Sequence, residues 1–291
     1  FLFMLPAFAY AQRQYSGIVL QQNSLEPLPF ASLALLGENV GTNTDEQGLF
    51  VLHSYRPRLN DTVLISSVGF RSVRLPVSVL QQTDTIWLEK MPTVLKSVDL
   101  VSKKHWIRRT VNDVSRCGTN YLEGSADMQQ IAQLMEADTV DFYLSQVTLC
   151  KYAIPLIQPD KCIFRLQILA YDSLTGGPGV LLNDSLIEVK TTAHRVQVDL
   201  EAYRIRIAAR RFYVALEWLR IPYNGGTEKF KMDGVKVRQT VYSPLLCHER
   251  YTRNHPRPPD TPYRVWFRDY RGRWKPMPEV NRLMMETQIK Y

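Results

Sequence analysis

Residue types that support hydrolytic or metal chemistry are few in this chain. None of the five histidines is followed by Glu three positions later: they are His53, His105, His194, His248 and His255. A zinc peptidase that binds its metal through a His-x-x-Glu pair is therefore excluded. The sequence also contains no GxSxG nucleophile elbow, no HExxH helix and no phosphate-binding glycine-rich loop. We therefore expect no catalytic residues, no metal site and no cofactor.

Three acidic residues in segments of strand character, Glu188, Asp199 and Glu217, are the candidates for a glycosidase-type carboxylate pair. The separation of two carboxylates is a property of the fold, so a hydrolase remains an alternative. We expect Asp199 to cap or pin a strand end, and Glu217, beside Trp218, to pair with an arginine. The segment Asp45-Glu46-Gln47-Gly48 offers two carboxylates. Calcium requires about six to eight oxygens, so we expect a turn there.

The four cysteines are Cys117, Cys150, Cys162 and Cys247, and four cysteines allow three complete pairings. Cys150 and Cys162 would face each other if the strands that hold them flank a hairpin loop, so this pair is the candidate disulfide. Unpaired thiols buried in the apolar interior are the alternative. The chain has no CxxC spacing, so neither a zinc ribbon nor a thioredoxin-like site is expected.

Short segments of strand character, separated by turn residues, run through the first part of the chain. Residues 29–35 are mostly apolar, and residues 42–52 have the pattern of a β-hairpin. Residues 62–70 contain a further strand, which Gly69 interrupts at an expected bulge or bend. Residues 84–88 make a last strand. This spacing of strands and turns is typical of a β-sandwich or a barrel.

The order of these blocks resembles the carboxypeptidase regulatory-like domain, which is a small transthyretin-like β-sandwich. The resemblance rests on residues 29–35, 41–50 and 64–70. It implies a module that Bacteroidota-type bacteria use widely at the front of envelope proteins. In the zinc carboxypeptidases this domain is an accessory, so the resemblance implies no peptidase activity. We therefore expect a protein that is not an enzyme.

The first residues predict export. The apolar run 1–8 continues as Ala9-Tyr10-Ala11 before Gln12, which is the pattern that ends a secretory signal peptide. A buried N-terminal strand is the alternative. No cysteine follows this site, so a lipoprotein anchor is not expected, and no other apolar run approaches the length of about twenty residues that a membrane-spanning helix needs. The expected location is the periplasm, the outer membrane or the cell surface.

Residues 140–242 predict a second all-β domain, because strand patterns alternate with glycine-rich and Asn-Asp turns. Four segments resemble, in the same order, a jelly-roll-type domain that often follows the regulatory-like module: 164–168, 177–182, 198–200 and 212–218. That companion domain has no established activity, so the resemblance implies architecture rather than chemistry. Residues 125–136 fit a helix by their periodicity and a strand by the resemblance, and both interpretations stay open.

Exported jelly rolls bind glycans by stacking sugar rings on exposed aromatic side chains. The candidate ligand-binding residues are Tyr171, Trp218 and Tyr223, which would form a platform if they emerge on one loop face or one outer sheet. Trp218 lies within an apolar strand, so a place in the core is the alternative for it. Tyr223 precedes the turn Asn224-Gly225-Gly226 and is the best exposed candidate.

The net charge of +8 is unevenly distributed, because residues 243–291 hold ten Lys/Arg against five Asp/Glu. This Pro- and Trp-rich tail is expected to wrap over the second sandwich, with a partner-binding peptide as the alternative. A basic tail can contact anionic lipid or polysaccharide, and a solvated surface is the simpler interpretation. Nucleic acid is not an expected partner, because the chain carries no recognisable reader motif.

The expected fold class is all-β, with two β-sandwich domains, the first transthyretin-like and the second jelly-roll-like. The expected organisation is a signal remnant, the regulatory-like sandwich, a linker with a helix or an edge strand, the second sandwich and a basic extension, at 1–11, 12–102, 103–138, 139–242 and 243–291. The expected function is that of an exported, non-catalytic envelope protein that acts as an adaptor or binding module, with envelope proteins or glycans as partners. A glycan-binding protein of a surface polysaccharide system and an undetected hydrolase are the alternatives.

Overall fold

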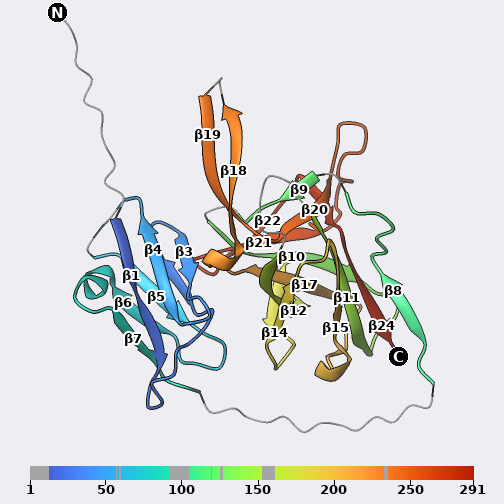
Figure 1. The fold of residues 1–291 in the computed structure, drawn as a ribbon. Coiled ribbons are helices and arrows are strands. Elements are labelled where there is room, and N and C mark those ends of the chain that lie inside the picture. The colour runs from blue at the N-terminus through green and yellow to red at the C-terminus, as the bar shows by residue number, and fades with distance from the viewer. Residues whose placement is uncertain are drawn as a thin grey trace, which may run out of the picture. The chain divides into compact units, whose positions relative to one another are not determined.

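The structure is a computed structural model. It describes residues 13–91 except 57 and 59, 105–152 except 119, 125 and 126, and 161–291 except 233 and 234; for 228–232 and 235–239 it describes the backbone alone. The chain divides into two compact units, Phe1–Thr93 and Val94–Tyr291. The described residues form twenty-four strands and three short 3-10 helices (Figure 1). The expected all-β fold class is therefore confirmed, whereas the expected signal remnant at 1–11 lies outside the described residues.

The first unit consists of two sheets, drawn in blue to cyan in Figure 1. The three-stranded sheet has the order β4-β1-β7, and the four-stranded sheet has the order β3-β2-β5-β6. β1 and β7 pair in parallel, whereas the other paired strands of this unit are antiparallel. The elements are β1 (Arg13–Gln21), β2 (Ser32–Leu35), β3 (Val40–Asn43), β4 (Leu49–Ser54), β5 (Thr62–Ser66), β6 (Val73–Pro76), η1 (Val77–Gln81) and β7 (Thr85–Leu88).

One apolar cluster joins the two sheets of the first unit. Alternate residues of β4 are exposed and buried, so Phe50 and Leu52 enter the cluster while their neighbours face solvent. Leu33 of β2 and Ile65 of β5 enter it from the other sheet. The two apolar faces thus cover each other, which makes the unit a β-sandwich.

The turn that precedes β4 forms as its residue types predict. Oδ1 of Asp45 accepts hydrogen bonds of 2.9 Å from the backbone N–H groups of Gln47 and Leu49. Gly48 has a φ of 76°, a left-handed conformation that glycine adopts without steric cost. The turn interpretation is therefore confirmed. No group of His, Cys, Asp and Glu that could hold a metal ion occurs among the residues that the structure describes.

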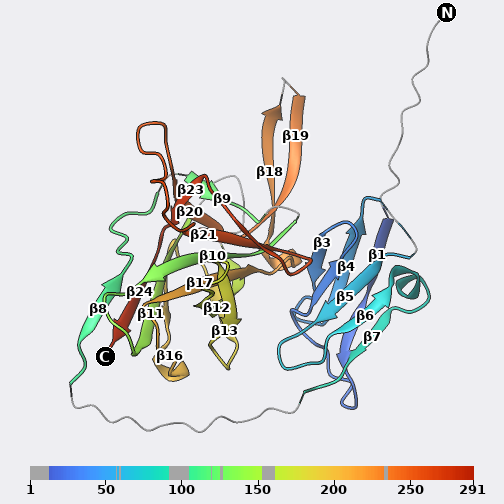
Figure 2. The ribbon, with the colours of Figure 1, turned by 180° about the vertical axis from the view of Figure 1, so that it is seen from behind.

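The second unit is built on two larger sheets, drawn in green to red in Figures 1 and 2. The seven-stranded sheet has the order β13-β12-β17-β10-β21-β22, and β14 also pairs with β12. Its strands are β10 (Met128–Glu136), β12 (Cys162–Tyr171), β13 (Pro178–Leu181), β14 (Ile187–Thr191), β17 (Arg211–Trp218), β21 (Val265–Asp269) and β22 (Trp274–Pro276).

The eight-stranded sheet has the order β23-β20-β11-β24-β8, with β15 and β16 paired to β11 and β9 paired to β20. Its strands are β8 (Arg108–Val111), β9 (Asn120–Leu122), β11 (Phe142–Tyr152), β15 (Arg195–Asp199), β16 (Arg206–Ile207), β20 (Leu245–Arg250), β23 (Val280–Leu283) and β24 (Met285–Lys290). The remaining elements are η2 (Glu201–Tyr203), η3 (Pro222–Asn224) and the strands β18 (Gly225–Met232) and β19 (Val235–Tyr242), which form a separate hairpin. None of the helices in the described residues is long and apolar enough to cross a membrane.

The apolar core of the second unit lies between its two large sheets. Phe164 and Trp218 enter it from the seven-stranded sheet, and Phe142 and Leu144 enter it from the eight-stranded sheet. The rings of Phe142 and Phe212 pack against each other with their centroids 5.8 Å apart. Two sheets packed face to face around one core make this unit a second β-sandwich.

Residues 128–136 form a strand, β10, which resolves the ambiguity between helix and strand. β10 pairs with β17 along one edge and with β21 along the other, so it lies inside the seven-stranded sheet. Its apolar residues are not confined to alternate positions, because both of its faces are covered. Residues 108–136, in the segment expected to be a linker with a helix or an edge strand, supply three strands of the second unit, of which β8 lies at the edge of its sheet and β10 inside it.

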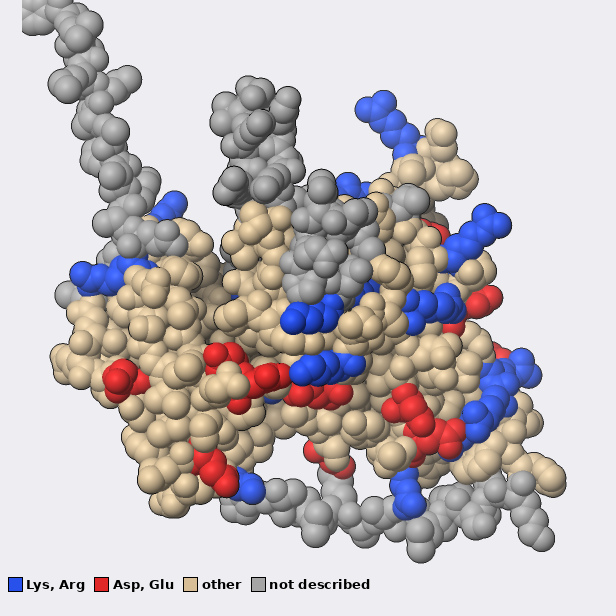
Figure 3. All heavy atoms as spheres, in the orientation of Figure 1, with Lys and Arg blue, Asp and Glu red and all other residues tan. Residues whose placement is uncertain are grey.

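The tail 243–291 completes both sheets of the second unit, so the expectation that it wraps over a finished sandwich is wrong. β21 pairs with β10 in one sheet, and β24 lies between β11 and β8 in the other. Part of the tail's charge is neutralised in ion pairs, such as Arg273 with Asp269 and Arg282 with Glu249. Figure 3 shows Lys and Arg interspersed with Asp and Glu on the face that it draws.

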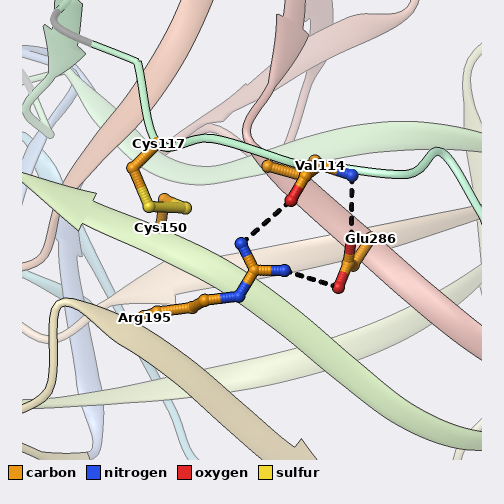
Figure 4. Close-up of a disulfide and its surroundings, with 5 residues drawn as sticks. All are labelled: Val114, Cys117, Cys150, Arg195 and Glu286. Atoms are coloured by element: carbon orange, nitrogen blue, oxygen red, sulfur yellow. Dashed lines mark hydrogen bonds and ion pairs between the residues drawn. A yellow bond between two sulfur atoms is a disulfide. The ribbon is translucent and has the colours of Figure 1, made fainter.

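The predicted disulfide between Cys150 and Cys162 is wrong. Cys150 lies in β11 and Cys162 in β12, and these consecutive strands belong to different sheets rather than to one hairpin. Cys150 is instead bonded to Cys117, in the loop between β8 and β9 (Figure 4). Among the described residues, Cys162 and Cys247 form no disulfide and both are buried, which agrees with the alternative of thiols placed in the apolar interior.

Polar contacts hold the loop of Cys117 to the sheet at a second point (Figure 4). The backbone N–H of Val114 donates to Glu286 Oε2 at 2.8 Å. Arg195 donates from Nη1 to the carbonyl oxygen of Val114 at 2.9 Å and from Nη2 to Glu286 Oε1 at 2.8 Å. The disulfide and this network therefore fix one loop to three strands of the eight-stranded sheet, β11, β15 and β24.

Candidate binding site

The candidate site lies on the face of the seven-stranded sheet that is turned away from the apolar core, which we call the outer face. Side chains alternate along a strand, so the core position of Phe164 in β12 places its neighbour Arg165 on the outer face. Strand register then extends this face across the sheet. Its members include Arg165, Gln167, Leu169, Tyr171, Tyr213, Glu217, Gln130, Leu134, Trp266 and Arg268.

A row of charged and amide side chains crosses the outer face from strand to strand. Arg165 of β12 is in register with Glu217 of β17, which is in register with Gln130 of β10. Gln130 is in turn in register with Arg268 of β21. The side chains of Arg165, Glu217 and Gln130 are buried. The row therefore sets one buried carboxylate between two guanidinium groups.

Burial and the neighbouring arginines shift the pKa of the Glu217 carboxyl group in opposite directions. Burial raises the pKa of its carboxyl group, and the nearby guanidinium groups of Arg165 and Arg268 act in the lowering direction. Nε2 of Gln167 donates a hydrogen bond of 3.5 Å to Glu217 Oε2. Burial lowers the pKa of Arg268, while the charges of Glu217 and Asp269 counteract that change. Glu217 thus lies in the electric field of two guanidinium groups, and a direct ion pair between Glu217 and one of them stays a prediction.

An aromatic stack lies on the same face, at the end of β12. Tyr213 is fully buried and donates a hydrogen bond of 2.7 Å to the carbonyl oxygen of Gly176, and its burial raises the pKa of the phenol. The ring of Tyr171 stacks on that of Tyr213, with centroids 6.2 Å apart and planes 6° apart. The guanidinium of Arg211 lies 5.4 Å from the centre of the Tyr171 ring. Arg211 is itself held by Glu136, at 2.7 Å.

A second aromatic group adjoins this stack. Trp266 packs closely against Gly177. A Cβ added at position 177 would lie only 3.1 Å from the indole ring, so the contact requires glycine there. Its Nε1 donates to the carbonyl oxygen of Tyr263 at 3.1 Å, and the two rings meet edge to face at 6.2 Å. The guanidinium of Arg257 lies 4.5 Å from the centre of the Tyr263 ring. The outer face thus combines partly exposed tyrosine rings with guanidinium and carboxylate groups.

These groups suit the binding of a polar ligand that has flat apolar faces. Aromatic rings offer a stacking surface, and arginine and carboxylate groups form directional, charge-assisted hydrogen bonds. Tyr171 and Tyr263 are partly exposed, and Arg211 is exposed, whereas Tyr213 and Trp266 are buried beneath or beside them. The buried members therefore position the exposed ones, and the exposed ones are available to a ligand.

The structure does not bring the three predicted aromatic residues together. Tyr171 lies on the outer face, whereas Trp218 is fully buried in the core, as the alternative for it expects. Tyr223 lies in η3, whose Asn224 accepts a hydrogen bond from Ile163 at the start of β12. Tyr171 ends the same strand, about 26 Å further along it at 3.3 Å per residue.

The structure places the three predicted carboxylate candidates on different strands of the second unit. Asp199 belongs to β15 in the eight-stranded sheet and accepts a hydrogen bond of 2.9 Å from the backbone N–H of Glu201, so its expected capping role is confirmed. Glu188 and Glu217 lie on strands either side of β12. Arg165 stands between them in register, with its Nε 3.9 Å from Glu188 Oε2.

The sequence interpretation missed most residues of the outer face. The alternation of Phe164-Arg165-Leu166-Gln167-Ile168 correctly predicts a strand with two different faces. The same rule places Tyr213 and Glu217 on one face of their strand. Trp266 and Arg268 had no such signal, because their segment was expected to form an extension rather than a strand of this sheet.

Asp269, the last residue of β21, follows Arg268 of this row and carries a second buried carboxylate, whose electrostatics can be tested. Its side chain is fully buried and accepts hydrogen bonds from Arg273, from the backbone N–H at 2.9 Å and from Nε at 3.0 Å. Lys275 Nζ lies 3.2 Å from Oδ2. Burial on its own raises the pKa of this carboxyl group, but the hydrogen bonds outweigh it, so the pKa is lowered from 3.8.

Replacing Asp269 with asparagine is expected to lower the free energy of unfolding at pH 7 by about 1 to 3 kcal/mol, because buried donors lose a charged acceptor. A lowered pKa gives stability that is present above the ordinary pKa and is lost as the pH falls through the folded value. The deficit of Asp269→Asn should therefore shrink between pH 7 and pH 3 in urea unfolding followed by circular dichroism. An equal deficit at both pH values would contradict a charged role for Asp269.

Comparison with known proteins bears on the first unit. No curated protein is significantly similar to the chain. Residues 15–98, which contain all of the first sandwich except the first two residues of β1, match the family of the CarboxypepD_reg-like domain. The match agrees with the resemblance noted for residues 29–70. The first unit of this chain is therefore similar to the CarboxypepD_reg-like domain, a regulatory rather than a catalytic module.

Proposed function

We propose that this chain is an exported, non-catalytic binding module of a bacterial cell envelope, and that its second unit binds a glycan on the outer face. The observation that carries the proposal is the assembly of Tyr171, Tyr213 and Arg211 on one face beside a row of buried charged groups. The regulatory-like first unit supports a role without catalysis. A jelly-roll-like identity of the second sandwich belongs to the same proposal.

Sugar recognition needs an apolar plane and directional polar groups close to it. The ring of Tyr171 is partly exposed and is supported by Tyr213, so its exposed part can contact the apolar face of a pyranose. Arg211 and Glu136, which are 2.7 Å apart and both exposed, can donate to and accept from the hydroxyl groups of the sugar. A rigid stack beneath the exposed ring reduces the entropy that binding would cost.

Two observations support an exported setting. The apolar run that ends in Ala9-Tyr10-Ala11 has the pattern of a secretory signal peptide. The disulfide between Cys117 and Cys150 is of a kind that persists in oxidising compartments such as the bacterial periplasm and the cell surface. Both features fit a protein of the periplasm, the outer membrane or the cell surface.

The test is binding of the full chain to a glycan array, followed by calorimetry with the glycan that is found. Tyr171→Ala is expected to weaken that binding at least about tenfold, because the ring would supply the central stacking contact. Tyr223→Ala is the matched control, since it removes a partly exposed tyrosine at the opposite end of β12 and should leave affinity unchanged. A wild-type chain that binds no glycan, or equal loss in both variants, would contradict the proposal.

An adaptor role is the second candidate, and exposed apolar residues at the edge of the seven-stranded sheet favour it. β13 ends the strand order of that sheet, and its Val180 and Leu181 are 72% and 49% exposed. Leu174, in the preceding turn, is 95% exposed. Exposed apolar residues on an edge strand are typical of protein-binding surfaces. Loss of a protein partner on Val180→Ser, with no effect of Tyr171→Ala, would favour this role over glycan binding.

A further inference from the structure

A third cysteine lies in the region of the disulfide. Cys150 of β11 is bonded to Cys117 in the loop between β8 and β9 (Figure 4). Cys247 of β20 is buried and forms no disulfide. Cys150 and Cys247 belong to one buried apolar cluster, together with Val114. Cys162 belongs to a different cluster, the core between the two large sheets. Cys247 is therefore the thiol that shares the surroundings of the disulfide.

Strand register sets Cys150 and Cys247 at corresponding positions. The antiparallel pairing of β11 with β20 includes Lys151↔Leu246. The next position along each strand in this register holds Cys150 and Cys247. Met284 links their backbones: its carbonyl oxygen accepts a hydrogen bond of 2.9 Å from the N–H of Cys150, and its N–H donates one of 2.8 Å to the carbonyl oxygen of Cys247. The two cysteines are thus held on either side of one residue, with both side chains in the same cluster.

The three cysteines differ in their contact with solvent. Cys117 is exposed, whereas Cys150 and Cys247 are buried. Burial raises the pKa of the Cys247 thiol to about 11. The thiolate is the form that attacks a disulfide, so with this pKa only about one Cys247 in 10⁴ is reactive at pH 7. The bond between Cys117 and Cys150 is therefore protected at neutral pH.

The ionisable groups on the elements around Cys247 leave burial as the cause of its raised pKa. These groups include two tyrosines, one histidine and one ion pair: Tyr121, Tyr152, His248, and Arg195 with Glu286. The phenols carry no positive charge, and burial lowers the pKa of His248, which is therefore neutral above pH 7. The two charges of the ion pair offset each other.

We propose that Cys247 can replace Cys117 as the partner of Cys150 through thiol–disulfide exchange within the chain. The Cys247 thiolate attacks Sγ of Cys150, the bond between Cys117 and Cys150 breaks, and Cys117 leaves as a thiolate that takes up the proton released by Cys247. One disulfide and one thiol are present before and after the step, so it needs no external oxidant or reductant.

The exchange changes what the disulfide holds. The new bond joins two strands, β11 and β20, that are already paired in the eight-stranded sheet. The loop between β8 and β9 loses its covalent link and keeps the polar contacts of Val114 with Arg195 and Glu286. Cys117 becomes a thiol in an exposed position. The second unit thus contains a redox-sensitive switch that releases a loop, and this switch is independent of any glycan on the outer face.

Alkaline pH should drive the exchange. An exposed thiol such as the released Cys117 titrates near about pH 8.5, whereas the buried thiol of Cys247 has a pKa of about 11. Between these two values the released thiol ionises and the buried one does not, which favours the exchanged form. The ratio of exchanged to original disulfide is therefore expected to rise about 30-fold from pH 7 to pH 10.

The test is incubation of the full chain at pH 7 and at pH 10 without added thiol, followed by acid quenching and digestion with pepsin. Mass spectrometry of the non-reduced digest should show the pair Cys117–Cys150 at pH 7, and the pair Cys150–Cys247 should increase at pH 10. Circular dichroism at pH 10 checks that the chain is still folded. Absence of the Cys150–Cys247 pair from the folded chain at pH 10 would overturn the proposal.

Two variants with matched chemistry complete the test. Cys247→Ala is expected to keep the pair Cys117–Cys150 at both pH values, because the attacking thiol is gone. Cys162→Ala removes the other buried cysteine and should leave the yield of the Cys150–Cys247 pair within about twofold. Pairs that contain Cys162 in the wild-type digest would show exchange through the unfolded chain and would overturn the proposal, as would a loss of the new pair in Cys162→Ala.

Discussion

Trp218→Ala is expected to lower the free energy of unfolding of the second unit by about 3 to 5 kcal/mol, the usual cost of removing a large buried ring. Trp218 is fully buried in the core between the two large sheets. Its Nε1 donates a hydrogen bond of 2.9 Å to the carbonyl oxygen of Pro244. A Cβ at Gly124 would lie 2.9 Å from the indole, so the chain packs closely on it. Alanine would leave a cavity and an unpaired carbonyl group.

Urea unfolding followed by circular dichroism measures this effect. Trp218→Phe is the graded control, because it keeps an aromatic ring in the core but removes the indole N–H. We expect it to cost about 1 to 3 kcal/mol, less than alanine, through the lost hydrogen bond and partial loss of volume. A cost below about 1 kcal/mol for Trp218→Ala would mean that the residue is not a core residue.

Cys117→Ser is expected to destabilise the second unit by about 4 kcal/mol, because it opens a disulfide that closes a long loop. Cys117 and Cys150 are separated by 33 positions in the sequence. Without the bond, the unfolded chain gains the conformational freedom of that loop. The loop between β8 and β9 would keep only its polar contacts to the sheet, which run through Val114, Arg195 and Glu286.

Two measurements separate this pairing from the one that the sequence suggested. Mass spectrometry of a non-reduced digest should yield a peptide pair joined through Cys117 and Cys150, and a pair joined through Cys150 and Cys162 would contradict the structure. Cys162→Ala is the control variant for stability. Cys162 is buried and forms no disulfide, so its replacement should cost only about 1 kcal/mol for a small cavity.

Local pattern predicts the strands well where the signal is contained in the strand itself. The blocks 164–168 and 212–218 lie in β12 and β17, because alternating burial and flanking turns are properties of a few neighbouring residues. The turn at Asp45 and Gly48 follows from residue types in the same way. The first sandwich is predicted for this reason, and its similarity to the CarboxypepD_reg-like domain agrees with it.

The local sequence pattern predicts the wrong structure for a segment when the strands that pair with it lie far away in the sequence. Residues 128–136 show a helical period, yet they become a strand because β17 and β21 pair with both of their edges. The proline-rich tail looks like an extension, yet β24 completes the other sheet between β11 and β8. Each of these partners is contributed by a segment more than seventy residues away or from the opposite end of the unit, so no local window contains it.

The sequence by itself determined that this protein is all-β and that it has two sandwiches, and it contains no His-x-x-Glu pair. It also identified Trp218 as a candidate core residue and Tyr171 as a candidate binding residue. Only the tertiary structure decided which residues meet, because strand order and register are set by the burial of whole faces rather than by single segments. That is why Cys150 bonds to Cys117, and why Glu217 lies between Arg165 and Arg268 on one face.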